Sequence, residues 1–249
     1  MTATGVRDGR AGSAFPDPPP TDEVEWARIV ARAPELPISA RPVVVVAPHP
    51  DDESLAVGGV LVELAAHDVE VEVVAVTDGE ASHPDLGNLG TLRTEEQRRA
   101  LAALGIESPP ARLGLPDGQV SHHGPALIDA LTERSGPETL LIAPWAHDGH
   151  PDHDACGVAA VEVARRTGCG LWAYPLWAWR WASPSDLAPL SLRRVTLSAK
   201  AQEAKAKAIA CHQTQTTHLD GPPILADDVL AHFRRPWDVI IDGRDLIGD

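Results

Sequence analysis

The sequence contains little cysteine and no long apolar run. Its three cysteines, Cys156, Cys169 and Cys211, are odd in number and lack metal-ligand spacing, which argues against a disulfide scaffold and favours a reducing compartment. No apolar stretch reaches about 18 residues, and the N-terminus lacks a basic region followed by an apolar core, so neither a membrane span nor export is predicted. We therefore expect a cytoplasmic protein.

Basic residues are also scarce relative to acidic ones. The chain has 21 Lys and Arg against 36 Asp and Glu, a net charge of −15, so nucleic acid and anionic membranes would be repelled as partners. Small neutral or cationic substrates remain open. Neither a Gly-x-Gly-x-x-Gly motif nor a phosphate-binding P-loop is present, and Gly58-Gly59 lies inside a predicted helix, where close packing explains it better than dinucleotide binding.

The pattern along the 249 residues predicts one α/β domain. Residues 1–22 are rich in Gly, Pro, Asp and Ser and are predicted to form a disordered leader before a single domain at 23–249. Strands are expected at 43–47, 69–77, 111–115, 139–143, 171–176, 193–198 and 237–242. Helices are expected at 26–33, 54–66, 91–104, 124–135, 154–167 and 199–212. Such alternation predicts a Rossmann-like three-layer fold with a mostly parallel sheet.

Two clusters of histidine and carboxylate follow predicted strands. The strand at 43–47 leads directly to His49, Asp51, Asp52 and Glu53, and the strand at 139–143 leads to the run from His150 to Asp154. Because parallel strands end at one edge of the sheet, the clusters are expected to meet there and bind a divalent transition metal with one open position. Turn and helix-cap roles for the acids, and solvated loop histidines, are the competing interpretations.

These motifs resemble those of the PIG-L or LmbE-like zinc-dependent de-N-acetylases. The segment from Pro48 to Glu53 matches the first family motif, with Pro48 in place of the usual alanine, and His-Pro-Asp-His stands intact from His150 to His153. Weaker matches occur in the family order at 77–80, at Arg93 with Glu96, at 115–118 and from Lys205 through His212 to Gln215.

The resemblance implies a role for each motif residue. The zinc ligands would be His49, Asp52 and His153. Asp51 would act as general base, and a protonated His150 would face the developing oxyanion, with Asp152 orienting it and raising its pKa. Two histidines and one carboxylate also suit Fe(II), so the ligands leave the metal open, although a free Asp51 favours hydrolysis.

Four further residues are candidate substrate contacts. Arg93 is expected to bind a substrate group, with a surface pair to Glu96 as the alternative. Asp117 and Glu80 follow strands on the same rim and are expected to hydrogen-bond substrate, although Asp117 also suits a turn. Trp145, beside the second motif, is a candidate pocket wall.

The segment 171–181 contains four of the seven tryptophans. Trp177, Trp179 and Trp181 alternate, so an extended chain would place them on one face. A strip of this kind is more often packed in a core or interface than used to bind sugar or acyl groups.

The expected function is zinc-dependent removal of an N-acetyl or short N-acyl group from an amino-sugar conjugate of the N-acetylglucosamine type. The alternatives are an amidase of the same family acting on another acylated amine, and a catalytically silent metal- or sugar-binding protein. The sequence leaves open the aglycone, the acyl group, whether Asp51 or His150 protonates the leaving amine, and whether the chain forms a homo-oligomer.

Overall fold

The computed structural model describes residues 21–38, 40–83, 86–219 and 221–247. Most of the expected leader, residues 1–20, lies outside these ranges. The first described residues already belong to the fold, because Thr21 is buried and Asp22 accepts the N–H of Glu25 at 2.8 Å. That contact caps helix α1 (Glu23–Val30), which begins three residues before the helix expected at 26–33.

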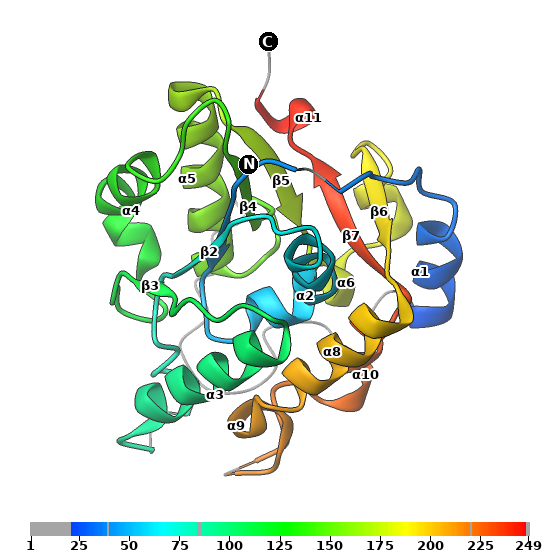
Figure 1. Ribbon diagram of the computed structural model, residues 1–249. Coiled ribbons are helices and arrows are strands. Elements are labelled where there is room, and N and C mark those ends of the chain that lie inside the picture. Colours follow the sequence, from blue (N-terminus) through cyan, green and yellow to red (C-terminus); the bar gives the residue numbers. More distant parts are fainter. Residues whose placement is uncertain (1–20, 39, 84–85, 220, 248–249) are drawn as a thin grey trace, which may run out of the picture.

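A single seven-stranded sheet organises the chain, in the order β3-β2-β1-β4-β5-β7-β6 (Figure 1). β1 to β5 run parallel, while β7 is antiparallel to both of its neighbours. The strands are β1 (Val43–Ala47), β2 (Val71–Ala75), β3 (Ala111–Arg112), β4 (Leu140–Pro144), β5 (Gly170–Tyr174), β6 (Leu192–Thr196) and β7 (Trp237–Asp242). All seven expected strands are present, although those expected at 69–77 and 111–115 are shorter.

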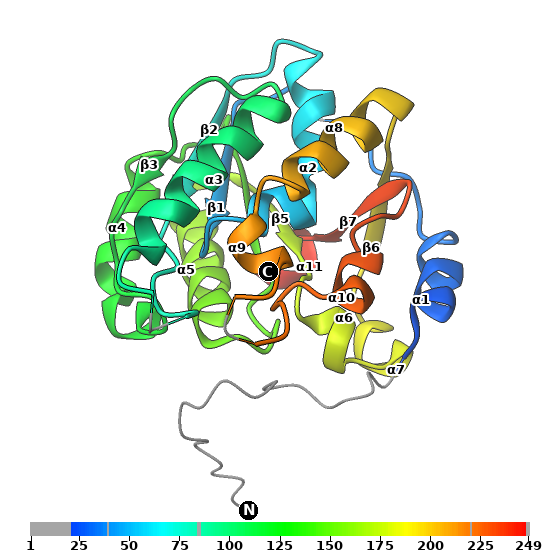
Figure 2. The same ribbon diagram turned by 90° about the horizontal axis from the view of Figure 1, so that it is seen from below.

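Helices cover both faces of the sheet, which gives the predicted three layers (Figures 1 and 2). α2 (Asp52–Ala65), α3 (Leu89–Ala103) and α8 (Ala199–Ile209) pack on one face, and α4 (Gly124–Thr132) and α5 (Pro151–Thr167) on the other. β1 shows why. Its residues are all buried, Val43 and Val45 in the core with α2, and Val44 and Val46 in the core with α5.

Close packing fixes α2 against the part of the chain after β6. A Cβ built on Gly59 would lie 2.3 Å from Cδ1 of Leu197, so a larger residue would require the Leu197 side chain to move. The expected close approach of this helix is therefore present, but its partner is the Leu197 side chain between β6 and α8. Buried Lys205 of α8 forms an ion pair with Asp238 of β7, which also accepts the N–H of Val60 at 2.9 Å.

Several short helices were not predicted. They are the 3-10 helix η1 (Val120–His123), α6 (Ala178–Trp181), α7 (Pro184–Leu187), α9 (Gln213–Thr216), α10 (Asp227–Ala231) and α11 (Arg244–Ile247). In the described residues, none of the helices is long and apolar enough to cross a membrane.

α6 changes the interpretation of the tryptophan-rich segment. The idea that Trp177, Trp179 and Trp181 share one face of an extended chain is wrong, because α6 starts at Ala178 and turns successive side chains to different sides. Trp179 is buried and meets Trp26 of α1 edge-on, with 5.2 Å between ring centroids. This part of the segment is core.

Candidate metal centre and active site

The two predicted motifs meet at the carboxyl edge of the sheet. β1 leads through His49 into α2, and the neighbouring β4 leads into α5, which carries His153. The rings of His49 and His153, 104 residues apart in the sequence, come within 3.3 Å of each other. The two histidine motifs therefore meet because β1 and β4 are parallel neighbours and a helix begins just after each strand.

Three side-chain atoms form a regular triangle. Nδ1 of His49, Oδ2 of Asp52 and Nε2 of His153 each lie 3.3 Å from the other two. Atoms that bind zinc tetrahedrally at about 2.0–2.1 Å lie ~3.3–3.4 Å from one another. The buried triangle therefore has the size and the donor set that a zinc ion requires.

The surroundings of His153 favour positive charge. Burial opposes protonation of this ring, but Asp52 and the carboxylate of Asp148, 2.9 Å from Nδ1, raise the pKa of His153 to about 9. The site thus attracts a cation, as a metal centre must.

Asp148 was missed by the sequence analysis. It is fully buried, and its carboxylate accepts backbone N–H groups of Leu176, Trp177 and Ala178 as well as approaching His153. A histidine that binds a metal commonly donates its other N–H to a carboxylate, so an acid close to the motif was the available signal.

Asp152 contacts a different histidine from the one expected. Its carboxylate accepts the N–H of Gly118 at 2.7 Å and of Val120 at 3.1 Å, and its Oδ2 lies 3.3 Å from Nε2 of His49. Asp152 therefore contacts the ring of His49, one of the three triangle residues. Its contact with His150 is made by the backbone, whose N–H donates to Nδ1 of His150 at 3.3 Å.

The surroundings of His150 disfavour the protonated ring that was expected, and its protonation state stays a prediction. Burial, together with the charges of His49 and His153, lowers the pKa of His150 to about 3, and the charge of Asp152 does not offset this. The ring centroid lies 4.8 Å from that of His49 and 5.0 Å from that of His153. His150, His49 and His153 are close enough to form an alternative ligand group, although the atoms of the triangle with Asp52 lie closer together.

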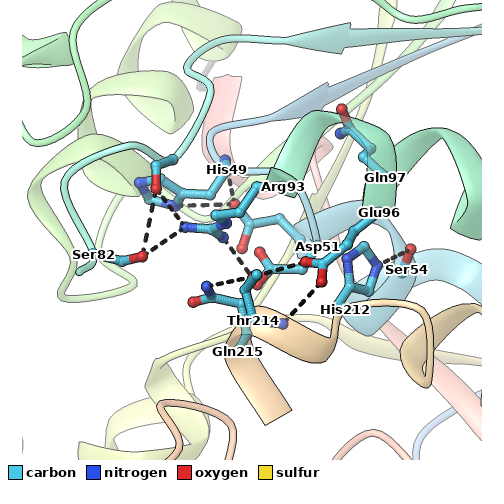
Figure 3. A network of polar contacts seen from close by, with 12 residues as sticks. His49, Asp51, Ser54, Ser82, Arg93, Glu96, Gln97, His212, Thr214 and Gln215 are labelled. Carbon is cyan, nitrogen blue, oxygen red and sulfur yellow. Dashed lines mark hydrogen bonds and ion pairs between the residues drawn. The ribbon is translucent and has the colours of Figure 1, made fainter. Parts of the chain in front are cut away.

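Arg93 contacts Asp51 rather than Glu96. Its Nη2 donates to Oδ2 of Asp51 at 3.1 Å, and its Nη1 donates to the carbonyl of Gly79 at 3.0 Å and to Oγ of Ser82 at 3.3 Å (Figure 3). Glu96 instead accepts the backbone N–H and hydroxyl of Thr214. The alternative of a surface Arg93–Glu96 pair is therefore wrong, since both side chains are buried and bound elsewhere.

Asp51 is a buried carboxylate outside the triangle. It precedes α2 without capping it. Burial raises its pKa, while the nearby Arg93 guanidinium acts in the opposite direction. A desolvated carboxylate next to the three atoms of the triangle is suitably placed to accept a proton.

Glu80 and Asp117 link the loops that follow β2 and β3. Oε1 of Glu80 accepts the N–H of Asp117 at 3.0 Å, and Oδ2 of Asp117 accepts the N–H of Ala81 at 2.8 Å. Oδ1 of Asp117 lies 3.2 Å from Nε2 of His49. Burial opposes ionisation, but the contact with His49 lowers the pKa of Asp117 to about 2. Both residues lie on the expected rim, and their contact with substrate stays a prediction.

Trp145 lies beside a different cavity. Its buried ring stacks on Trp181 at 6.4 Å and meets His147 edge-on at 5.6 Å. With Val158 and Leu246 it lines a cavity of about 260 Å³. The described residues around that cavity include none of the three triangle residues, so a role as a wall of the metal site has no support from this geometry.

A family model described as PIG-L, GlcNAc-PI de-N-acetylase, matches residues 44–164. Residues 44–164 of the chain are therefore similar to the PIG-L family. The PIG-L match begins in β1 and ends in α5, and it contains the triangle residues together with Asp51 and His150.

Individual PIG-L-like relatives agree with this similarity. The chain is 31% identical over 135 residues to a probable N-acetyl-alpha-D-glucosaminyl L-malate deacetylase 2 of Bacillus anthracis, covering 49% of this chain and 59% of the relative. It is 30% identical over 174 residues to a 1D-myo-inositol 2-acetamido-2-deoxy-alpha-D-glucopyranoside deacetylase of Mycolicibacterium gilvum (strain PYR-GCK). That match covers 56% of this chain and 58% of the relative. The matches thus span less than two thirds of the length of these curated relatives.

A solved structure supports the fold. The N,N'-diacetylchitobiose deacetylase from Pyrococcus horikoshii superposes with a TM-score of 0.58 at 21% identity, covering 81% of this chain and 82% of that one. At this identity the likeness shows that the chain shares the architecture of that protein.

Proposed function

We propose that the chain is a metal-dependent hydrolase that removes an N-acetyl or short N-acyl group from an amino-sugar conjugate. One observation carries the proposal. The three ligand-type atoms of His49, Asp52 and His153 lie 3.3 Å apart, and beside them stands Asp51, a buried carboxylate outside the triangle. A site that only bound a metal would not need Asp51.

His49, Asp52 and His153 would hold the ion. Zinc bound there would supply a Lewis acid and a water that ionises near neutral pH. The donor set suits Fe(II) as well, so zinc is part of the proposal. Asp51 would accept the proton of the attacking water, and Arg93 would hold its carboxylate in place.

His150 would act as a neutral hydrogen-bond donor. Its Nδ1 accepts the N–H of Asp152, so in the neutral ring the proton sits on Nε2. An Nε2–H group can donate to a carbonyl oxygen as negative charge develops on it, and donation needs no imidazolium. The same proton is available to the leaving amine, and Asp51 is the other group able to deliver one.

The substrate class comes from the relatives. Both curated relatives are named as deacetylases of N-acetylglucosamine-type conjugates, one with malate and one with inositol. Glu80 and Asp117 on the rim are proposed to hydrogen-bond sugar hydroxyls. An amidase acting on another acylated amine is the second candidate, since the triangle and Asp51 would serve either amide. A cytoplasmic location is proposed from the three unpaired cysteines.

The test combines metal analysis with acetate release from a panel of N-acetylglucosaminides. We expect about one zinc or iron per chain and acetate release from at least one conjugate. Asp51→Asn should retain the metal and lose a factor of about 10² or more in turnover, the usual range for a general base. Asp227→Asn, the same change at an exposed position, is the matched control.

Three results would count against the proposal. Purified protein that contains no stoichiometric metal would contradict the proposed metal centre. Wild-type turnover in Asp51→Asn would contradict the role of Asp51 as general base. Bound metal with no hydrolysis of any amide would support the silent binding protein.

A further inference from the structure

Asp148 joins the candidate ligand His153 to the chain that follows β5. Its Oδ2 lies 2.9 Å from Nδ1 of His153 and accepts the N–H of Trp177 at 3.0 Å. Its Oδ1 accepts the N–H of Leu176 at 2.8 Å and of Ala178 at 3.0 Å. Each carboxylate oxygen therefore has two partners, and the side chain is fully buried.

We propose that Asp148 is a positioning residue that fixes the ring orientation and the tautomer of His153. This inference rests on the proposed function, because it assigns His153 to the metal. A ring that donates Nδ1–H to Asp148 keeps its Nε2 lone pair on the side of His49 and Asp52, as a ligand must.

The three backbone amides explain why Asp148 itself cannot turn. Backbone N–H groups only donate, so both carboxylate oxygens must remain acceptors where they lie. Rotation would break contacts with Leu176, Trp177 and Ala178 at the same time, leaving buried donors without partners, each at a cost of about 1–3 kcal/mol.

The aromatic segment anchors those amides. Nε1 of Trp181 donates to the carbonyl of Asp148 at 2.7 Å. Gly149 has φ +93°, and a Cβ there would lie 2.7 Å from the same Nε1, so the loop and the indole are in close contact. Trp179, two residues earlier, is buried against Trp26. The tryptophan-rich segment thus supports the metal centre through Asp148.

Asp148→Asn tests the proposal with little change in size. Its –NH2 group cannot accept a hydrogen bond from any of the four partners. When the –NH2 group faces His153, Nδ1 of the His153 ring must accept its hydrogen bond. The ring proton then sits on Nε2, where it blocks metal binding. Zinc affinity, measured by competition with a chromophoric chelator, should fall about 10- to 100-fold.

Asp154→Asn is the matched control. Asp154 stands in the same motif, is half-buried, and its carboxylate accepts the N–H of Gly149. This variant should bind zinc within about twofold of the wild type, because Nδ1 of His153 keeps its partner.

The second measurement needs no substitution. In zinc-loaded wild-type protein, ¹⁵N-edited NMR should show His153 protonated at Nδ1 and not at Nε2. An unprotonated Nδ1 would overturn the proposal, even if Asp148→Asn does not fold. Equal zinc affinity of Asp148→Asn and wild type would also overturn it. If wild-type protein binds no zinc at all, the proposed function fails first, and the two failures are distinguishable.

Discussion

Removal of the Arg93 guanidinium should reveal how strongly it is coupled to Asp51. Arg93 is 3% exposed and Asp51 5%, and their atoms meet at 3.1 Å. Arg93→Met keeps the apolar part of the side chain but leaves the Asp51 carboxylate without its cation. Breaking a buried pair in this way costs about 3–5 kcal/mol of unfolding free energy.

The expected cost is smaller when Asp51 is already neutral. In an Asp51→Asn background, Arg93→Met still loses hydrogen bonds to Gly79 and Ser82, together worth about 1–3 kcal/mol. The double-mutant cycle should therefore give a coupling energy of about 2 kcal/mol. Urea unfolding of the four proteins, with metal content held equal, measures it.

Arg98→Met is the control on the same helix. Arg98 is exposed and pairs with Glu95 on the surface, so its removal should leave the urea unfolding midpoint almost unchanged. The same cost of Arg93→Met in both backgrounds would refute the reasoning. Arg93 would then support the loop through Gly79 and Ser82 alone, and Asp51, the proposed general base, would need another partner.

Two further predictions concern stability away from the triangle. Burial lowers the pKa of His212 to about 3, whereas in the unfolded chain the pKa is about 6.5. Between these two pH values only the unfolded chain binds a proton at this residue, so the protein loses stability as the pH falls. From pH 7 to pH 5 this loss amounts to about 2 kcal/mol of unfolding free energy. Urea unfolding at several pH values should show that His212→Gln removes this part of the pH dependence. The same pH dependence in His212→Gln and wild type would show that His212 is protonated in the folded protein. Trp26→Ala should lower the unfolding free energy by about 3–5 kcal/mol, measured by urea denaturation, because the fully buried ring packs on Trp179; a cost under about 1 kcal/mol would mean that α1 is not part of the core.

The sequence was sufficient to predict the strands and long helices. Buried parallel strands such as Val43–Ala47 form continuous apolar runs, and a run that ends in His-Pro-Asp marks both the strand end and the site. The meeting of the His49 and His153 motifs followed from the rule that parallel strands end at one edge.

Contacts between distant residues were not predictable in the same way. Asp51 and Arg93 are 42 residues apart, and Asp152 and His49 are 103 residues apart, so sequence spacing carries no information about either pair. Spacing instead suggested Glu96 as the alternative partner of Arg93, and the family resemblance suggested His150 as the partner of Asp152. Helices of four or five residues, such as α6, are too short to show a helical period.

The support of Asp148 by backbone amides has a consequence for how the protein can vary. A backbone N–H is supplied by every amino acid except proline, so residues 176–178 can change identity and still hold the carboxylate. Mutational libraries over this segment that exclude proline and retain apolar residues at the buried positions Leu176 and Ala178 should therefore alter the surroundings of the site while leaving the metal centre intact. Natural selection has the same freedom, so these three side chains can change without changing the support of Asp148.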